Sequence, residues 1–341
     1  MVDNLFVVES PLQALNALEL SLQFKDEKNG IVYRVVEGRE KNNNQMTEVI
    51  GKGVWTFKKE IIFDSSSTLL NHKSVALELK KLSKRFPKGI KKLFIGEFRS
   101  QWMHFMRCAV SPSRTVLMDD GAATLIVKQK FIDNGIYYPA ALWKNKNIIK
   151  ELAKRYIYSD FLKRSELESP LHFASAFNKE GALYPIDFSS LIEMFKKNFE
   201  KIERKSVFFF GSKYSESGII SRDYEVFFLK GVKQFYSKYK CDLVYCAHRD
   251  ESQEKLEIIR NELKLNVFTG SKPAEIFLLE NHCKIHEIAG AYSSVLNNAK
   301  VLFPEASIRG FRLDPKEISY KYKEDIELVY KHLEKKGVVI S

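Results

Sequence analysis

Short apolar stretches alternate with longer amphipathic stretches through the first third of the chain. Runs of consecutive apolar residues predict buried strands, and apolar residues spaced three or four positions apart predict helices. The expected strands are 5–9, 30–36, 60–63, 91–96 and 115–118. The expected helices are 12–24, 68–85 and 100–110. Strands that alternate with helices in this way predict a parallel sheet covered by helices on both faces.

The alternation restarts beyond the middle of the chain. Strands are expected at 206–211, 242–247, 266–269, 284–288 and 301–303. Helices are expected at 223–239, 252–263, 273–280 and 324–336, and at a further segment that begins near Ser293. The segment 140–203 lacks a clear strand rhythm, so we expect a linker and covering helices there.

These two regions predict an α/β protein with two Rossmann-like domains that face each other across a cleft. A chain of 341 residues suits two domains. We expect the first domain at 1–203, the second at 204–310 and a C-terminal helical segment at 311–341. Ligands of such sheets bind beyond the carboxyl ends of the strands, so the loops after the strands are the places to look for functional residues.

Two adjacent carboxylates and a glycine, Asp119-Asp120-Gly121, directly follow the strand expected at 115–118. A carboxylate in this position can act as a general base that takes the proton of an acceptor hydroxyl, and the glycine permits a sharp turn. The alternative is an N-cap for the next helix, which needs only one aspartate. We therefore expect Asp120 to be the catalytic base, with Asp119 as the second candidate.

His248 and the pair Ser293-Ser294 also lie just after expected strands. Imidazole titrates near neutral pH and a neighbouring phosphate raises its pKa, so His248 is a candidate general acid or hydrogen-bond donor to a leaving phosphate. Two hydroxyls at a helix N-terminus form a phosphate site. The alternatives are a solvated histidine and a plain serine N-cap. Asp250 and Glu251 are expected to cap the following helix.

The order and context of these three motifs resemble the bacterial lipooligosaccharide sialyltransferases (glycosyltransferase family 52) and their polysialyltransferase relatives. The resemblance implies the GT-B fold and an inverting, metal-independent transfer of a nonulosonic acid, such as sialic acid, from a CMP-activated donor to a lipooligosaccharide or capsule glycan. It implies catalytic roles for Asp120 and His248, and donor binding by Ser293-Ser294. One position departs from the family pattern, because Arg249 stands where a proline usually follows the histidine. Its guanidinium could itself contact phosphate.

Other loop residues near the same strand ends are expected to contact substrate. The donor-binding candidates, besides the serine pair, are Gly211, Ser212, Arg249 and Gly270. The acceptor-binding candidates are Ser10, Gln13 and Arg99. Among these, Arg99 would suit an acidic group of the acceptor.

The chain is basic, with a net charge of +12 at pH 7. A basic balance favours nucleic acid, an anionic membrane or an anionic substrate as partner. The lysines are scattered in pairs and no nucleic-acid-binding motif accompanies them, so nucleic acid is not expected. The lysines and the amphipathic stretch 324–336 instead suggest weak peripheral attachment to the anionic inner membrane.

Several classes of protein are disfavoured by features that the sequence lacks. No apolar run approaches the ~20 residues of a membrane span, and the first residues resemble a buried strand rather than a signal peptide, so we expect a cytoplasmic protein. The four cysteines lack metal-ligand spacing. Because Asp-x-Asp, GxGxxG and P-loop motifs are also absent, we expect neither a metal ion nor a bound cofactor.

Two rival functions stand beside this interpretation. The first is a GT-B transferase for another CMP-activated donor, namely Kdo, pseudaminic acid, legionaminic acid or a polyol phosphate. The second is a non-catalytic basic protein that binds membrane or nucleic acid. Release of CMP from a donor separates an enzyme from a binding protein.

Overall fold

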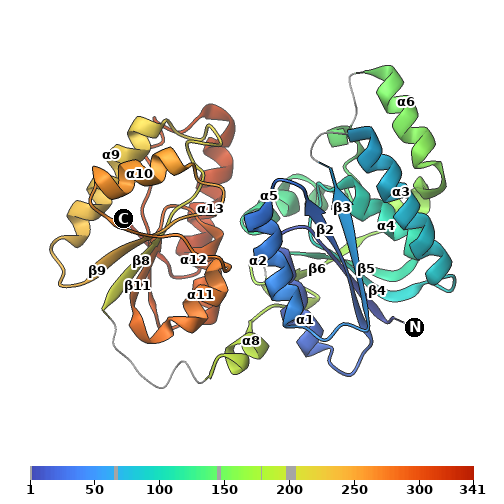
Figure 1. The fold of residues 1–341 in the computed structure, drawn as a ribbon, viewed down its shortest axis with the longest axis horizontal. Helices are drawn as coiled ribbons and strands as arrows, with labels where there is room; N and C mark the ends of the chain where they lie inside the picture. Colours follow the sequence, from blue (N-terminus) through green and yellow to red (C-terminus); the bar gives the residue numbers. More distant parts are fainter. Residues whose placement is uncertain (1, 65–67, 144–146, 178, 197–204) are drawn as a thin grey trace. The chain divides into compact units, whose positions relative to one another are not determined.

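The computed structural model describes residues 2–64, 68–143, 147–177, 179–196 and 205–341. The chain divides into two compact units, Met1–Ile186 and Asp187–Ser341, each built around a parallel sheet (Figure 1). The sequence predicts a domain boundary at 203/204, and residues 197–204 lie outside the described part. The segment 311–341 belongs to the second unit, because its strand β13 (Val339–Ile340) pairs with β12 (Ser307–Gly310).

The first unit contains, over its described residues, a seven-stranded sheet in the order β3-β2-β1-β4-β5-β6-β7. Its strands are β1 (Asn4–Val8), β2 (Asn29–Val36), β3 (Phe57–Phe63), β4 (Ile90–Ile95), β5 (Pro112–Met118), β6 (Leu171–Ser175) and β7 (Tyr184–Pro185). Its helices are α1 (Pro11–Gln23), α2 (Glu40–Gly51), α3 (Thr68–Arg85), α4 (Gln101–Val110), α5 (Ala123–Lys130), α6 (Ile148–Ile157) and α7 (Arg164–Leu167). Strand β1 lies between β2 and β4 and is buried throughout. A central parallel strand is covered on both faces, which explains its unbroken apolar run.

The second unit contains, over its described residues, a six-stranded parallel sheet in the order β10-β9-β8-β11-β12-β13. Besides β12 and β13, its strands are β8 (Ser206–Phe210), β9 (Asp242–Cys246), β10 (Asn266–Phe268) and β11 (Ile285–Gly290). Its helices are α8 (Ser189–Met194), α9 (Arg222–Tyr236), α10 (Gln253–Asn261), α11 (Ala274–Glu280), α12 (Ser294–Leu302) and α13 (Lys323–Lys335). The apolar core between sheet and helices gathers around β8, where Val207 and Phe209 pack against α9 and α10.

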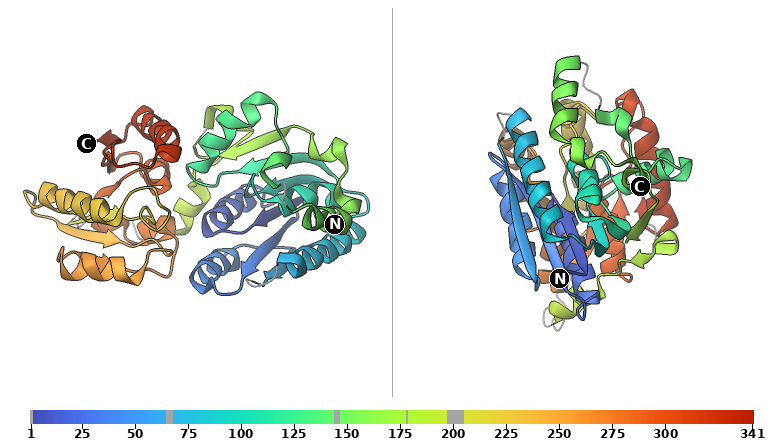
Figure 2. Two further views of the ribbon diagram at one scale, coloured as in Figure 1. Left: turned by 90° about the horizontal axis from the view of Figure 1, so that it is seen from above. Right: turned by 90° about the vertical axis from the view of Figure 1, so that its right-hand side faces the viewer.

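Both sheets share one topology. If the strands of each unit are counted from its N-terminal end, the first six follow the order 3-2-1-4-5-6 of the Rossmann fold, with helices on both faces (Figure 2). The strand order reverses between β1 and β4 in the first unit, and between β8 and β11 in the second. Ligands of such sheets bind at this reversal, outside the carboxyl ends of the strands. The topology therefore favours the loops after β1, β4, β8 and β11 as binding positions.

Four elements differ from the sequence predictions. The strand expected at 301–303 is wrong, because Leu302 is buried on the inner face of α12 and the strand follows at Ser307–Gly310. The segment 140–203 was expected to lack strands, but it contains β6 and β7, which are too short to show a clear rhythm. Helix α2 was not expected because its polar stretch buries few apolar residues.

The amphipathic helix α13 uses its apolar face within the second unit. Ile326, Val329, Tyr330 and Leu333 are all buried. This face is therefore occupied by the protein core, and the membrane attachment expected of this stretch does not find an exposed apolar surface there. No helix of the described residues is both long enough and apolar enough to cross a bilayer.

Candidate functional site

Asp119 is a buried support at the end of β5. Its carboxylate accepts hydrogen bonds from Ser175 Oγ (2.7 Å) and from the backbone N–H groups of Ala176 and Phe177. Its carbonyl accepts a hydrogen bond from Asn16 Nδ2 (3.0 Å). Burial raises the pKa of Asp119 to about 6, although the hydrogen bonds lower it. Because its oxygens are already used to join β5 to the end of β6, this arrangement favours Asp120 over Asp119 as the base.

Asp120 lies at the same strand end, with its side chain 26% exposed. Gln13 Nε2 donates to Asp120 Oδ1 (2.8 Å), and Arg99 Nη2 lies 3.6 Å from Asp120 Oδ2. The backbone N–H of Asp120 donates to Thr124 Oγ1 (3.0 Å), and Gly121 adopts a positive φ of 64° that turns the chain into α5. The structure thus brings the predicted base together with two predicted acceptor residues, Gln13 and Arg99.

Glu97, from the loop after β4, lies close enough to Asp120 for the two carboxyl groups to influence each other's pKa. Arg99 holds Glu97 through hydrogen bonds from Nε (3.0 Å) and Nη2 (2.8 Å). Burial opposes ionisation, but the bonds from Arg99 and Asp120 lower the pKa of Glu97 overall. Burial, followed by the negative charge of Glu97, raises the pKa of Asp120 well above its usual range. Such a shift moves a carboxyl group toward the working pH that suits a general base.

The N-terminus of α1 positions Gln13. Ser10 caps the helix, because its Oγ accepts a hydrogen bond from the backbone N–H of Gln13 (3.3 Å). Gln13 Oε1 in turn accepts a hydrogen bond from the backbone N–H of Glu9 (2.9 Å). A Cβ atom at Gly96 would overlap Gln13 Oε1, so this close approach requires glycine. Ser10 therefore supports Gln13, and its contact with an acceptor stays a prediction.

A cavity of about 550 Å³ lies beside these residues within the first unit. Its walls combine aromatic rings with charged groups: Glu9, Arg34, Phe63, His72, Glu97, Arg99, Ser100, Gln101, Trp102, Trp143 and Tyr158. In its wall Glu9 pairs with Arg34 (3.1 Å) and accepts hydrogen bonds from Ser100 Oγ and Trp102 Nε1. Aromatic surfaces with a few placed polar groups are typical of ligand sites.

His248, in the loop after β9, carries a neutral ring near pH 7 in this structure. Its Nδ1 accepts a hydrogen bond from the backbone N–H of Asp250 (3.1 Å), which places the proton of the neutral ring on Nε2. Burial, followed by the positive charge of Arg249, lowers the pKa of His248 to about 4. The near-neutral pKa expected from the sequence is therefore absent without a ligand. Nε2–H remains a hydrogen-bond donor.

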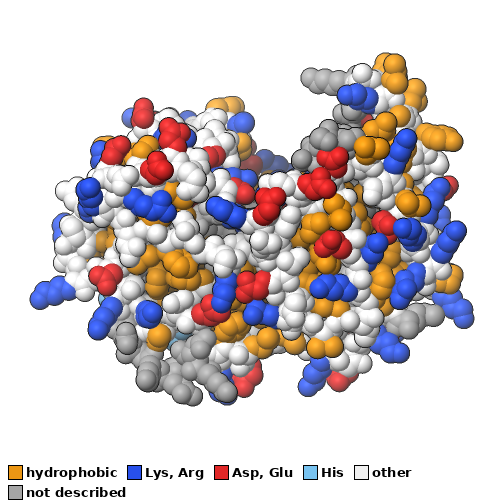
Figure 3. All heavy atoms as spheres, viewed as in Figure 1, with side chains coloured by type: hydrophobic (Ala, Val, Ile, Leu, Met, Phe, Trp, Pro, Cys, Tyr) orange, Lys and Arg blue, Asp and Glu red, His pale blue; other side chains and the backbone are white. Residues whose placement is uncertain are grey.

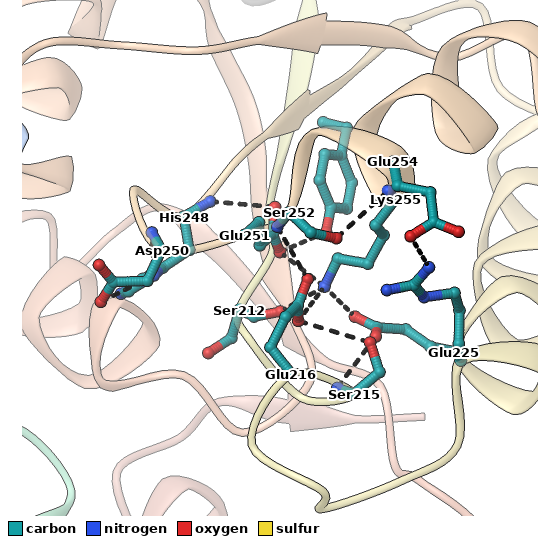
Figure 4. Close-up of polar contacts among 12 residues, drawn as sticks. Ser212, Ser215, Glu216, Glu225, His248, Asp250, Glu251, Ser252, Glu254 and Lys255 are labelled. Carbon is teal, nitrogen blue, oxygen red and sulfur yellow. Dashed lines mark hydrogen bonds and ion pairs between the residues drawn. The ribbon is translucent and has the colours of Figure 1, made fainter.

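A buried lysine, linked to His248 through Glu251, joins the loops after β8 and β9 (Figure 4). The side chain of Lys255 is 0% exposed. Its ammonium group lies close to three carboxylates, those of Glu225 (2.7 Å), Glu216 (3.1 Å) and Glu251 (3.2 Å). It also donates a hydrogen bond to the carbonyl of Ser212 (2.9 Å). A single cation thus holds residues from the two loops that contain donor-binding candidates.

Glu251 connects this cluster to the histidine loop. Its Oε2 accepts a hydrogen bond from the backbone N–H of His248 (3.2 Å). Burial raises the pKa of Glu251 to about 7, although Lys255 lowers it. The capping role expected for Glu251 is wrong, because Ser252 caps α10 by accepting a hydrogen bond from the backbone N–H of Lys255.

Gly211 and Ser212 shape the loop after β8. A Cβ atom at Gly211 would overlap the hydroxyl of Tyr245, which donates a hydrogen bond to Glu251 (2.8 Å). The carbonyl of Ser212 is held by Lys255. Both residues therefore contribute to the loop through their backbone, and their contacts with a donor stay predictions.

Ser293 and Ser294 lie at the N-terminus of α12, directly beyond β11. Ser293 caps the helix by accepting a hydrogen bond from the backbone N–H of Val295 (3.2 Å), and Ser294 is the first helical residue. Both serines are partly exposed. They occupy the switch-point position of the second sheet, where the helix N-terminus favours an anion.

Arg249 and Gly270 lie in the loops after β9 and β10 of the second unit. Burial raises the pKa of Glu275, on α11, and the positive charge of Arg249 partly opposes this rise. Gly270 follows β10 beside the ring of Phe268. Their roles in donor binding stay predictions.

Glu97 and Lys255 are among the charged residues of these clusters that were not singled out from the sequence. Glu97 directly follows an expected strand, as Asp120 does, so the rule that functional residues follow strands was sufficient to find it. Lys255 has no such signal, because a lysine four residues after a glutamate on a helix is usually an exposed pair. Within the described residues, no group of three His, Cys, Asp or Glu side chains is arranged to bind a metal ion.

Two Rossmann-like units with polar residues at their switch points define the GT-B class. The structure is similar to the alpha/beta-galactoside alpha-2,3-sialyltransferase of Photobacterium phosphoreum, with a TM-score of 0.55 and 12% identity over 99% of this chain and 97% of that one. It is also similar to a putative UDP-N-acetylglucosamine 2-epimerase of Listeria monocytogenes (TM-score 0.54, 10% identity, 99% and 87%) and to S. aureus MnaA with UDP (0.51, 12%, 98% and 88%). At these identities the likeness shows the GT-B fold, as the sequence predicts. A search of curated protein sequences finds no match.

The model of the family named alpha-2,8-polysialyltransferase (POLYST) matches residues 4–309. The chain therefore belongs to the alpha-2,8-polysialyltransferase family and is a glycosyltransferase of the sialyltransferase class. This confirms the family relationship inferred from the three motifs. The rival interpretation, a non-catalytic basic binding protein, is wrong.

Proposed function

We propose that this enzyme transfers a nonulosonic acid of the sialic acid type from a CMP-activated donor to a glycan acceptor, with inversion and without a metal ion. The observation that carries the proposal is the environment of Asp120. Its carboxyl group has a raised pKa and is partly exposed at the end of β5, beside the switch-point loops after β1 and β4. Family membership supports the sialic acid donor.

Asp120 is the proposed general base. An acceptor hydroxyl attacks the anomeric carbon while the bond from that carbon to the phosphate oxygen breaks, and the bonding electrons leave with CMP. The hydroxyl proton passes to Asp120, whose ionised form is required. Gln13 and Arg99 orient the carboxylate through the contacts at 2.8 Å and 3.6 Å. Base catalysis of this kind typically contributes a factor of about 10²–10⁴.

The second unit is the proposed site of the departing nucleotide. Negative charge develops on the phosphate as the bond breaks, and preorganised donors at that position lower the barrier. His248 offers Nε2–H, because its Nδ1 is engaged by the backbone of Asp250. The N-terminus of α12, with Ser293 and Ser294, offers backbone N–H groups and hydroxyls. A bound phosphate would raise the pKa of His248 from about 4 and convert it toward a proton donor.

The cavity of the first unit is the proposed acceptor site. Its aromatic walls suit the apolar faces of sugar rings, and Arg34 and Arg99 suit anionic groups. We propose a lipooligosaccharide or capsule glycan as the acceptor, reached from the cytoplasmic face of the inner membrane.

Thermal unfolding with nucleotides tests the donor assignment. A ligand that binds only the native state at 100 times its Kd stabilises the protein by about 2.7 kcal/mol, so CMP should raise the Tm while UMP and GMP do little. EDTA should change neither the Tm nor the transfer rate. A preference for UDP would overturn the CMP assignment. Transfer assays with CMP-sialic acid and CMP-Kdo, with CMP release and glycan product both measured, then identify the sugar.

A further inference from the structure

Helix α6 presents an unusual exposed apolar face in the first unit. Four large side chains, those of Ile148, Ile149, Leu152 and Tyr156, are 75%, 78%, 60% and 83% exposed, and we call them the α6 patch. At 100° per residue they fall within an arc of roughly 100° on the helix. Hydrophobic side chains gather over this helix on the molecular surface (Figure 3). Clustered exposed apolar side chains mark an interaction surface.

The rest of α6 is engaged by the protein, which fixes the direction of the patch. Ile157 packs against the core of the first unit. Lys154 is 12% exposed, pairs with Glu151 (2.9 Å) and donates a hydrogen bond to the carbonyl of Trp143 (2.6 Å). The helix therefore holds Glu151 and Lys154 inward and the four large apolar side chains of the patch outward, unlike an ordinary surface helix, which buries its apolar stripe.

The exposed charges next to the patch are positive. Lys150 is exposed, and Arg155 is 63% exposed with its Nε 3.4 Å from Glu151, whose other oxygen pairs with Lys154. Asp160, beyond the end of the helix, is paired with Lys80 (3.1 Å). A short apolar stripe with a terminal tyrosine and flanking cations has the composition of a helix that lies in the interface of an anionic bilayer.

We propose that α6 is an interfacial membrane anchor, whose patch enters the headgroup region of an anionic bilayer while Lys150 and Arg155 contact lipid phosphates. The helix spans 10 residues, so it can lie in the interface but is far too short to cross it. The net charge of +12 adds long-range attraction to anionic lipid. A second copy of the chain would also cover the apolar side chains, but its own Lys150 and Arg155 would provide no attraction for those of the first copy.

The patch lies next to the proposed acceptor cavity. Trp143 and Tyr158, which precede and follow α6, both line that cavity. Anchoring at α6 would therefore hold the cavity near glycans displayed on the bilayer. This last step rests on the proposed function, whereas the lipid-binding inference does not.

Vesicle sedimentation of the full chain tests the anchor. The variant Ile148→Ser/Ile149→Ser/Leu152→Ser/Tyr156→Ser should bind vesicles that contain phosphatidylglycerol at least about tenfold more weakly than the unmodified protein. The matched control Val54→Ser/Phe227→Ser/Tyr320→Ser removes side chains that are 85%, 70% and 89% exposed elsewhere, and it should bind normally. Phosphatidylcholine vesicles should bind weakly, and added salt should reduce binding to phosphatidylglycerol. The charge variant Lys150→Glu/Arg155→Glu should also weaken binding, which keeps the test decisive if the serine variant misfolds.

Three results would overturn the anchor. One is that the unmodified protein ignores phosphatidylglycerol vesicles, or that the patch variant binds them as well as the control does. Another is that the patch variant converts a dimer to a monomer in light scattering without a change in vesicle binding, which would identify a second copy as the occupant. The third is that the patch variant loses transfer to a soluble oligosaccharide while it still binds vesicles, which would show that the patch takes part in the reaction. If the unmodified protein shows no transfer at all, the proposed function is refuted, but the lipid-binding inference is unaffected.

Discussion

The two units place carboxylates and a cation at their strand ends in opposite ways. In the first unit, Asp120 and Glu97 share the partly exposed Arg99, whose guanidinium lies closer to Glu97 (2.8 Å) than to Asp120 (3.6 Å). In the second unit, Lys255 and Glu251 are both 0% exposed and packed in direct contact. The first cluster keeps one carboxyl group incompletely compensated and accessible. The second compensates its charges internally and binds the backbone of the neighbouring loops at Ser212 and His248.

This difference separates a reactive cluster from a supporting one. A general base needs a raised pKa and an accessible side chain, and Asp120 has a raised pKa and a side chain that is 26% exposed. A buried ion cluster contributes by holding loops in one arrangement, and removal of its central charge leaves its partners uncompensated. Under the proposed function, the same residue types serve chemistry in the first unit, whereas in the second they hold loops together. Mutations should therefore affect turnover at the first cluster and folding at the second.

The largest effect is expected at Asp120. Asp120→Asn keeps the shape of the side chain and removes the proton acceptor, so kcat should fall by about 10²–10⁴-fold. CMP affinity, measured by calorimetry, should be unchanged because the proposed nucleotide site lies in the second unit.

Asp119→Asn provides the comparison within the pair. Because Asp119 accepts hydrogen bonds from Ser175 and from two backbone N–H groups, this change should lower the Tm more than Asp120→Asn does. If Asp119→Asn loses turnover while Asp120→Asn retains it, the roles are exchanged. If both Asp119→Asn and Asp120→Asn retain turnover, neither aspartate is the base.

The next effect is on stability, at Lys255. Lys255→Met removes the only positive charge in direct contact with Glu225 and Glu251 among the described contacts, so the free energy of unfolding should fall by about 3–5 kcal/mol. Burial already raises the pKa of Glu251 and Lys255 opposes this rise, so removal of the lysine raises that pKa further above its unfolded value, and the loss of stability should grow as pH rises and shrink as pH falls. Urea unfolding between pH 5 and 8 measures both.

Lys230→Met, an exposed change on α9, is the matched control and should be nearly neutral. A Lys255→Met protein as stable as this control would show that the cluster does not hold the loops. A stability loss independent of pH would point to packing rather than to uncompensated carboxylates.

The sequence predicts the two sheets well because their strands are continuous apolar runs. It also predicts which loops contain candidate functional residues, because the carboxyl ends of parallel strands lie at one edge of the sheet. Asp120 and His248 follow from that rule. The contacts that give each residue its character do not, because they join distant positions: Gln13 reaches Asp120 across 107 residues, and Lys255 reaches Glu225 across 30. Local periodicity also misled at Leu302, where an apolar run fills the last turn of a helix instead of a strand.

The smallest expected effect sharpens the first cluster. Glu97→Gln removes the negative charge that helps to raise the pKa of Asp120, so that pKa should move down toward its usual range. The base acts when ionised, so activity rises with pH through this pKa, and the acid limb of the kcat/KM profile should shift to lower pH by about one unit. At the high-pH plateau, where the base is fully ionised, the rate should fall only modestly, because a base of lower pKa accepts a proton less readily. Glu40→Gln, an exposed change in the same unit, should leave the profile unmoved. An acid limb that stays in place in Glu97→Gln would show that burial alone tunes Asp120, and a shift to higher pH would mean that Glu97 stabilises the ionised base through Arg99.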